Sequence, residues 1–377
     1  MKNNSLGIYL HIPFCIRKCN YCDFCSFPDA SGARIGAYAD ELIKRITAFS
    51  ARYGKRQADT VYFGGGTPTL MPAECFEGVL AALKNCFDIS EDAEITVECN
   101  PASIEREGLA KLRAMGINRI SIGLQSANDD ELFLLGRLHS FEDFKRTFFS
   151  AREAGFDNIS VDLMHGIPNQ TRESFLKTLS QITKIAPEHI SAYGLKIEEG
   201  TAFYRNRHSL LLPDEDAEAE LYALCCEELL KGGYLQYEIS NFARAGKESR
   251  HNLKYWQLDD YIGFGVAAHS CFEGERFGNS RDIAAFLRGE DICCERESVS
   301  DNAFLDEYVM LALRLTRGID KREFFKLANK DIKEAFPLLD TYIKGGFMAE
   351  SEERIAFTTK GFLVSNVILS EMLSFEN

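Results

Sequence analysis

The chain has 377 residues, of which 45% are hydrophobic, and a formal net charge of −14 from 43 Lys and Arg against 57 Asp and Glu. This length predicts one large domain with a smaller one, and the acidic balance argues against a general nucleic-acid binder. No apolar run approaches the roughly 20 residues that a transmembrane segment needs, and no secretory signal follows Met1. We therefore expect a cytoplasmic protein; attachment to the periphery of the inner membrane would need no anchor.

Strand-like and helix-like segments alternate from residue 5 to about residue 197. The predicted strands are residues 7–12, 60–63, 94–98, 119–124, 160–164 and 189–195, and the predicted helices are residues 38–49, 72–86, 104–115, 141–154 and 171–185. Six such units predict an α/β fold with a parallel sheet covered by helices. A complete eight-unit barrel needs about 250 residues, so we expect a partial (β/α)6 barrel like an open TIM barrel.

The alternation fades beyond residue 200. We expect a helix over residues 214–231, a strand over 234–239, a polar segment over 250–256 and a glycine-punctuated apolar loop over 261–270. The last part predicts helices over residues 305–316, 321–328, 332–343 and 359–375, with a hairpin across 347–357. This pattern is typical of a small winged-helix-like domain. Its mixed charges favour packing or partner docking over DNA binding.

The first predicted strand runs into the densest group of cysteines. Cys15, Cys19 and Cys22 have the spacing C-x3-C-x2-C, and Cys25 follows three residues later. Thiolates on a short loop can hold an iron–sulfur cluster, and a cubane with three protein ligands leaves one iron open. A zinc site is the alternative, but no matching Cys or His pair lies nearby in the sequence. A disulfide framework is not expected, because the cytosol is reducing.

Unusual residues also follow the later predicted strands. The glycine turn 64–66 precedes Thr67, and polar side chains follow at Glu98, Gln125, Arg137 and Asp162. Each alone has an ordinary explanation, such as a tight turn, a helix cap or a solvated surface. The carboxyl ends of parallel strands share one rim, however, where ligands of such sheets bind. We therefore expect these residues to converge on one site.

The cysteine spacing and its place on the first strand resemble the radical S-adenosylmethionine (SAM) superfamily. This resemblance implies that Cys15, Cys19 and Cys22 ligate a [4Fe–4S] cluster, without Cys25, and that SAM binds the open iron. It also implies a reductant such as flavodoxin or ferredoxin. The residues that it places around SAM are Tyr9, Tyr21, Gly65, Gly66, Thr67, Glu98, Gln125, Arg137 and Asp162.

Further motifs resemble the branch that contains oxygen-independent coproporphyrinogen III dehydrogenase. Two features are instead similar to HemW-type haem chaperones: about ten residues precede His11, where the dehydrogenase has an extension, and His251–Trp256 fits the motif H-N-x-x-Y-W. This second resemblance implies a haem cargo held by His251, Asn252, Tyr255 and Trp256. The alternative is that His251 and Trp256 are core residues.

The sequence thus predicts a radical SAM core over residues 1–240, a connecting segment over 241–300 and a C-terminal helical domain similar to that of HemN over 301–377. The expected function is to bind haem and pass it to acceptor proteins, some of them membrane-associated. One alternative is an enzyme that oxidatively decarboxylates coproporphyrinogen III to protoporphyrinogen IX. A radical SAM methyltransferase is a third, but it would require a substrate module that the sequence does not show.

Overall fold

The computed structural model describes residues 5–29, 32–101, 103–298 and 301–373. The outermost residues of the predicted first and last domains, including the end of the last predicted helix, lie outside these ranges. None of the helices within them is both long and apolar enough to cross a membrane.

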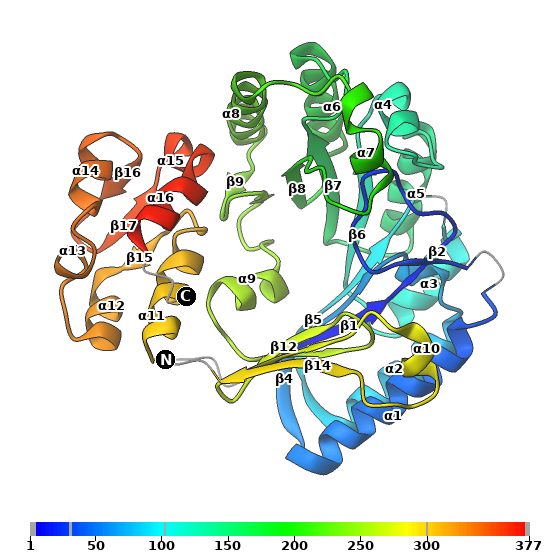
Figure 1. The fold of residues 1–377 in the computed structure, drawn as a ribbon. Coiled ribbons are helices and arrows are strands. Elements are labelled where there is room, and N and C mark those ends of the chain that lie inside the picture. Colours follow the sequence, from blue (N-terminus) through cyan, green and yellow to red (C-terminus); the bar gives the residue numbers. More distant parts are fainter. Residues whose placement is uncertain (1–4, 30–31, 102, 299–300, 374–377) are drawn as a thin grey trace.

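Six parallel strands form the core of the fold, which confirms the predicted partial barrel. Their order follows the sequence: β1 (Leu6–Ile12), β4 (Arg56–Gly65), β5 (Phe87–Cys99), β6 (Arg119–Gln125), β7 (Ile159–His165) and β8 (His189–Gly194). Figure 1 shows them as an open arc with the helices on its outer side. These helices are α1 (Ile35–Tyr53), α2 (Ala73–Cys86), α3 (Arg106–Ala114), α4 (Asp129–Leu134), α5 (Phe141–Glu153) and α6 (Arg172–Ile185).

Side-chain alternation explains the two faces of the sheet. On β1, Ile8 and Leu10 are fully buried within the main hydrophobic core, which the outer helices share. Tyr9 and His11 point to the opposite, concave face, because successive strand residues alternate. The concave face therefore collects aromatic and polar groups, while the convex face supplies the apolar contacts that hold the helices.

Additional strands extend the sheet at both edges. Beyond β8 lie the short antiparallel strands β10 (Asn241–Ala243) and β9 (Leu235–Gln236). Beyond β1 lie β11 (Tyr261–Phe264), β12 (His269–Phe272), β13 (Glu275–Asn279) and β14 (Cys293–Ser298), of which β11 is parallel to β1. Around them are α7 (Ala202–Arg205), α8 (Glu215–Lys231), α9 (Arg250–Trp256) and α10 (Ile283–Leu287).

The C-terminal part has its own hydrophobic core. A three-stranded sheet with the order β15–β17–β16 packs with short helices, as a winged-helix-like domain requires. Its elements are α11 (Asp301–Ala312), β15 (Ile319–Asp320), α12 (Lys321–Ala328), α13 (Ile332–Ala335), α14 (Leu339–Lys344), β16 (Met348–Glu350), β17 (Arg354–Phe357), α15 (Thr359–Leu363) and α16 (Ser365–Met372). In Figure 1 this domain, orange to red, lies beside α8 and α9.

Four sequence predictions about these outer parts were wrong. The single helix expected over 359–375 is, within the described residues, the two helices α15 and α16, which are separated at Val364. The apolar loop expected over 261–270 contains β11 and the start of β12, because pairing with β1 extends a segment that its glycines made look irregular. The strand expected over 234–239 shrinks to the two residues of β9. The helix expected over 332–343 is two helices, since Pro337 lacks the backbone N–H that a continuous helix needs.

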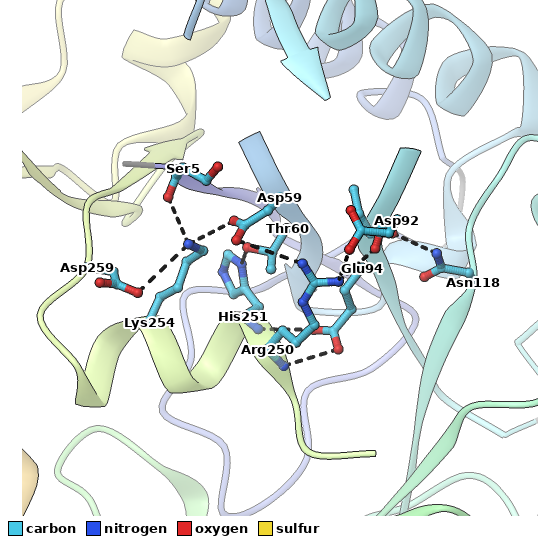
Figure 2. Close-up of polar contacts among 11 residues, drawn as sticks. Ser5, Asp59, Thr60, Asp92, Glu94, Asn118, Arg250, His251, Lys254 and Asp259 are labelled. Carbon is cyan, nitrogen blue, oxygen red and sulfur yellow. Dashed lines mark hydrogen bonds and ion pairs between the residues drawn. The ribbon is translucent and has the colours of Figure 1, made fainter. Parts of the chain in front are cut away.

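A buried cluster of charges fixes α9 against the concave face, near the amino ends of β1 and β4. The Lys254 side chain is 4% exposed, and its Nζ lies 2.8 Å from Asp59 Oδ1 and 2.8 Å from the Ser5 carbonyl oxygen. Figure 2 shows this lysine between Ser5, Asp59 and Asp259. A Cβ on Gly7 would lie 2.8 Å from Lys254 Cδ, so glycine is needed for α9 to approach β1 this closely.

Replacing Lys254 with alanine should destabilise the protein by about 3–5 kcal/mol, because it leaves Asp59 as a buried charge without its nearest cation. The free energy of unfolding from urea titration measures this effect. Lys111→Ala, which breaks an exposed pair with Glu107, is the control and should change stability by less than about 0.5 kcal/mol. Equal effects of the two changes would contradict a supporting role for the α9 ion pair.

Candidate functional site

The cysteine loop leaves the carboxyl end of β1 and folds over the rim of the barrel. It contains the short parallel pair β2 (Phe14–Cys15) and β3 (Phe27–Pro28). Cys15 and Cys25 are buried, whereas Cys19 and Cys22 are partly exposed. Asn20 fastens the loop to the end of α4, since its backbone N–H and side-chain amide donate to the carbonyl oxygens of Leu135 and Leu134.

The glycine turn after β4 lies directly beneath this loop. Gly65 has a φ of +117°, and a Cβ there would lie 2.7 Å from the His11 ring. A Cβ on Gly66 would lie 2.6 Å from the Phe14 carbonyl oxygen and 3.0 Å from Cys15 Sγ. Both glycines are thus required for the turn to pass under the cysteines, which brings the turn and the loop together as the sequence predicted.

A continuous set of hydrogen bonds joins two of the cysteines through the rim. Thr67 donates to Cys15 Sγ at 3.6 Å, and Asn100 Nδ2 donates to Thr67 Oγ1 at 2.5 Å. Arg137 then donates to Asn100 Oδ1 at 2.5 Å and to Cys19 Sγ at 3.5 Å. A cavity of about 90 Å³ lies here, lined by Cys19, Thr67, Asn100 and Arg137 among others.

Asn100 was not among the predicted site residues, although it belongs to a motif that the sequence shows, Glu98-x-Asn-Pro. Its amide both accepts from Arg137 and donates to Thr67, so it holds the two predicted residues in one arrangement. An asparagine directly after a strand end was the available signal. A single polar residue in a turn is common, however, and gave no reason to select it.

Glu98 connects the glycine turn to the barrel interior. Its carboxylate accepts from the Gly65 N–H at 2.9 Å and from the Tyr62 hydroxyl at 2.9 Å. Burial, together with the negative charge of Asp162, raises the pKa of Glu98 to about 7. Burial also raises the pKa of Asp162, which accepts from the Ser121 hydroxyl at 3.1 Å. Two carboxyl groups therefore face the lumen just below the rim.

Gln125 and Tyr21 complete the predicted rim. Gln125 is a buried non-glycine residue with a φ of +76°, at an irregularity in the pairing of β6 with β7. Such strained residues cluster at ligand sites. Tyr21 packs on a small apolar cluster formed by Leu135, Met164, Ile167, Leu195 and Phe203. The structure thus gathers the predicted SAM residues around one rim.

Tyr9 extends this group into the lumen. Its hydroxyl is 3.0 Å from His11 Nδ1, and its ring stacks on Tyr62 with centroids 6.1 Å apart. Burial raises the pKa of Tyr9 well above its ordinary value, so its hydroxyl stays protonated.

The predicted haem-binding motif lies on α9, deep in the barrel. His251 is 1% exposed, and its Nδ1 and Nε2 are each 2.8 Å from a hydroxyl, of Thr60 and of Tyr255 respectively. Its backbone N–H donates to Glu94, as Figure 2 shows. Burial lowers the pKa of His251 to about 3, so the imidazole is neutral. Asn252 and Trp256 are partly exposed.

His251 as an iron ligand stays a prediction, and this conformation does not favour it. Both ring nitrogens already have hydrogen-bond partners, and the ring stacks on Tyr62 with centroids 5.1 Å apart. A metal would have to displace one partner in a closed space. The geometry instead supports the alternative that His251 is a core residue.

Among the described residues, no three His, Cys, Asp or Glu side chains meet around a single ion position. A cubane cluster does not require its ligands to meet around one ion position, because each thiolate binds a separate iron atom. Three cysteines on one loop, with a hydrogen-bond donor already near the sulfur of two of them, form a donor set that suits such a cluster.

This partial barrel, with a cysteine loop over its rim, defines a radical SAM protein. Residues 9–182 match the radical SAM superfamily, and residues 299–364 match the HemN C-terminal domain. The solved structure of coproporphyrinogen III oxidase (HemN) from Escherichia coli aligns with 99% of this chain and 91% of its own, with a TM-score of 0.86 and 24% identity. That likeness extends the shared fold over the whole molecule.

The curated relatives indicate one family within this superfamily. The protein named "Heme chaperone HemW" from Bacillus subtilis (strain 168) is 34% identical over 97% of this chain and 98% of its own length. The relative with the same name from Escherichia coli (strain K12) is 33% identical over 99% and 100%. The chain therefore belongs to the HemW family.

Glu98 should give the protein a measurable pH dependence. Its folded-state pKa of about 7 lies above the ordinary 4.5, so the stability from the bound proton is present below pH 4.5 and is lost as the pH rises to 7. In Glu98→Gln, the free energy of unfolding should therefore fall less over this window than in the parent. Glu74→Gln, at an exposed position on α2, is the control and should keep the parent's slope. Identical slopes in Glu98→Gln and the parent would show that Glu98 does not hold this proton.

Proposed function

We propose that this protein is a radical SAM haem chaperone, which binds haem and passes it to acceptor proteins. The observation that carries the proposal is the identity of 34% to a relative named "Heme chaperone HemW" over nearly the full length of both chains. Two similar domains alone would leave other radical SAM activities open. Agreement along the whole chain, including α9 and the C-terminal domain, supports the same role.

In this proposal Cys15, Cys19 and Cys22 hold a [4Fe–4S] cluster. Cys25 is left out, as the C-x3-C-x2-C motif implies, and its carbonyl oxygen, 2.8 Å from His11 Nε2, helps to hold the loop. When bound with SAM, such a cluster supplies one-electron cleavage of a sulfur–carbon bond. Thr67 and Arg137 orient Cys15 and Cys19 through their hydrogen bonds.

SAM is proposed to bind along the rim that the structure gathers. Its amino group would meet the carboxyl groups of Glu98 and Asp162, and its carboxylate would meet the guanidinium of Arg137. Gly65 and Gly66 let the turn pass close under the cysteines, so that the methionine end would lie along this turn beside Thr67. Gln125 contributes an amide, while Tyr9 and Tyr21 supply aromatic walls that exclude water.

The proposed binding partners follow from the proposed chaperone function. Haem is the cargo, haem-binding proteins are the acceptors, some of them membrane-associated, and a flavodoxin or ferredoxin is the reductant. We also propose that the protein is located in the cytoplasm. The winged-helix-like domain offers a docking surface for such partners that needs no nucleic acid.

The ligand assignment has a direct test by anaerobic reconstitution. The parent should hold about four iron and four sulfide per chain, and Cys15→Ala, Cys19→Ala and Cys22→Ala should each lose most of them because a cubane needs every ligand. Cys25→Ala and the exposed Cys293→Ala are matched controls that should keep the parent's iron content. Full iron in any of the first three variants would contradict the assignment.

The function has a second test that separates chaperone from enzyme. Reconstituted protein should bind haem saturably and deliver it to apomyoglobin, followed by the shift of the haem absorption band. With coproporphyrinogen III, SAM and dithionite it should form no protoporphyrinogen IX. Robust formation of that product, without haem binding, would replace the chaperone proposal with the oxidative decarboxylase.

A further inference from the structure

Asn100 stands between the two side chains that donate hydrogen bonds to proposed cluster ligands. It follows β5 directly and is half-buried in the rim. On one side its amide donates to Thr67, which donates to the sulfur of Cys15. On the other side the amide accepts from Arg137, which donates to the sulfur of Cys19. These four contacts form one chain, so a single side chain connects both sulfur donors.

The backbone of Asn100 is held independently of its side chain. Its carbonyl oxygen accepts from the Ser103 N–H at 3.1 Å and from the Ser103 hydroxyl at 2.6 Å. The same hydroxyl lies 2.7 Å from the hydroxyl of Thr69, just beyond the glycine turn. Pro101 follows Asn100 and restricts its backbone further. A change of the Asn100 side chain should therefore leave the path of this turn intact.

The orientation of the Asn100 amide is dictated by its partners. A guanidinium has only donors, so the amide oxygen must face Arg137 and the amide nitrogen must face Thr67. Because Thr67 Oγ1 accepts from this nitrogen, its own O–H hydrogen is free to point at Cys15 Sγ. Thr67 is only 3% exposed, so water competes little for this hydroxyl. The asparagine thus sets the direction of the hydrogen bond toward the sulfur.

At the other end of the chain, Arg137 brings a positive charge to the second sulfur. Its Nη1 donates to Cys19 Sγ at 3.5 Å. Its Nη2 donates to Asn100 Oδ1 and to the Gly123 carbonyl oxygen, each at 2.5 Å. A planar guanidinium that is fixed at these points has little freedom to turn away. Asn100 therefore helps to keep the cation beside Cys19.

Donors at the ligand sulfurs have a defined effect on an iron–sulfur cluster. One-electron reduction adds a negative charge to the cluster, and hydrogen bonds to the sulfurs are among the factors that set its reduction potential. Donors and a nearby cation stabilise the more negative, reduced form, so their loss should lower the potential. An asparagine that only filled the rim would change stability and leave the potential unaltered.

We propose that Asn100 is a positioning residue that raises the reduction potential of the [4Fe–4S] cluster, because it directs Thr67 and Arg137 at two ligand sulfurs. This inference rests on the proposed function, which places the cluster on the cysteine loop. The step concerned is the uptake of one electron by the oxidised cluster from the flavodoxin or ferredoxin proposed above. Control of that step is thereby assigned to a residue that is not itself a cluster ligand.

The test is a redox titration of the anaerobically reconstituted protein with dithionite and mediators, followed by electron paramagnetic resonance of the reduced cluster. Asn100→Asp keeps the oxygen that faces Arg137 but replaces the amide N–H with an acceptor, so the Thr67 hydroxyl should turn away from the sulfur. At the parent's midpoint potential, the ratio of reduced to oxidised cluster should fall about tenfold, which corresponds to about 59 mV for one electron.

Three further variants separate hydrogen bonding from added charge. Asn100→Ala adds no charge and should also lower the ratio, as should Thr67→Val, which removes the hydroxyl. The double variant should show less than the sum of the two effects, because both changes remove the same donor. Asn329→Asp adds a negative charge at an exposed position of the C-terminal domain, and this control should titrate like the parent.

Iron and sulfide contents, measured first, distinguish the possible failures. Both Asn100 variants should keep the parent's content, since all three cysteine ligands remain. An unchanged midpoint in these variants would overturn the inference. Loss of their iron would overturn it too, because the residue would then be required for assembly of the cluster. A parent that holds no cluster would instead contradict the proposed function on which the inference rests.

Discussion

The buried ion pair between Lys254 and Asp59 is the constraint from which much of the barrel interior follows. Charges with so little solvent are tolerated only when they are paired and hydrogen-bonded, so the pair fixes α9 against β1 and β4. With α9 fixed, His251 stacks on Tyr62, Tyr62 donates to Glu98, and Glu98 accepts from the Gly65 N–H. The H-N-x-x-Y-W motif is thereby connected to the glycine turn under the cysteines.

This connection gives the motif a structural role that its sequence alone did not show. From the sequence, His251 and Trp256 suggested a porphyrin site because imidazole binds iron and indole packs on flat rings. In the structure, the histidine supports a tyrosine and the lysine supports the helix. The same residues thus support the radical SAM rim from below.

The sequence predicted the six core strands and most of their helices because buried parallel strands have a strong apolar pattern that neighbours cannot easily override. It failed where pairing partners decide. The segment 261–264 contains glycine and looks irregular, yet β1 provides a ready edge and makes it a strand. Likewise, Asn100 matters through two bonds to residues 33 and 37 positions away, which spacing alone does not reveal.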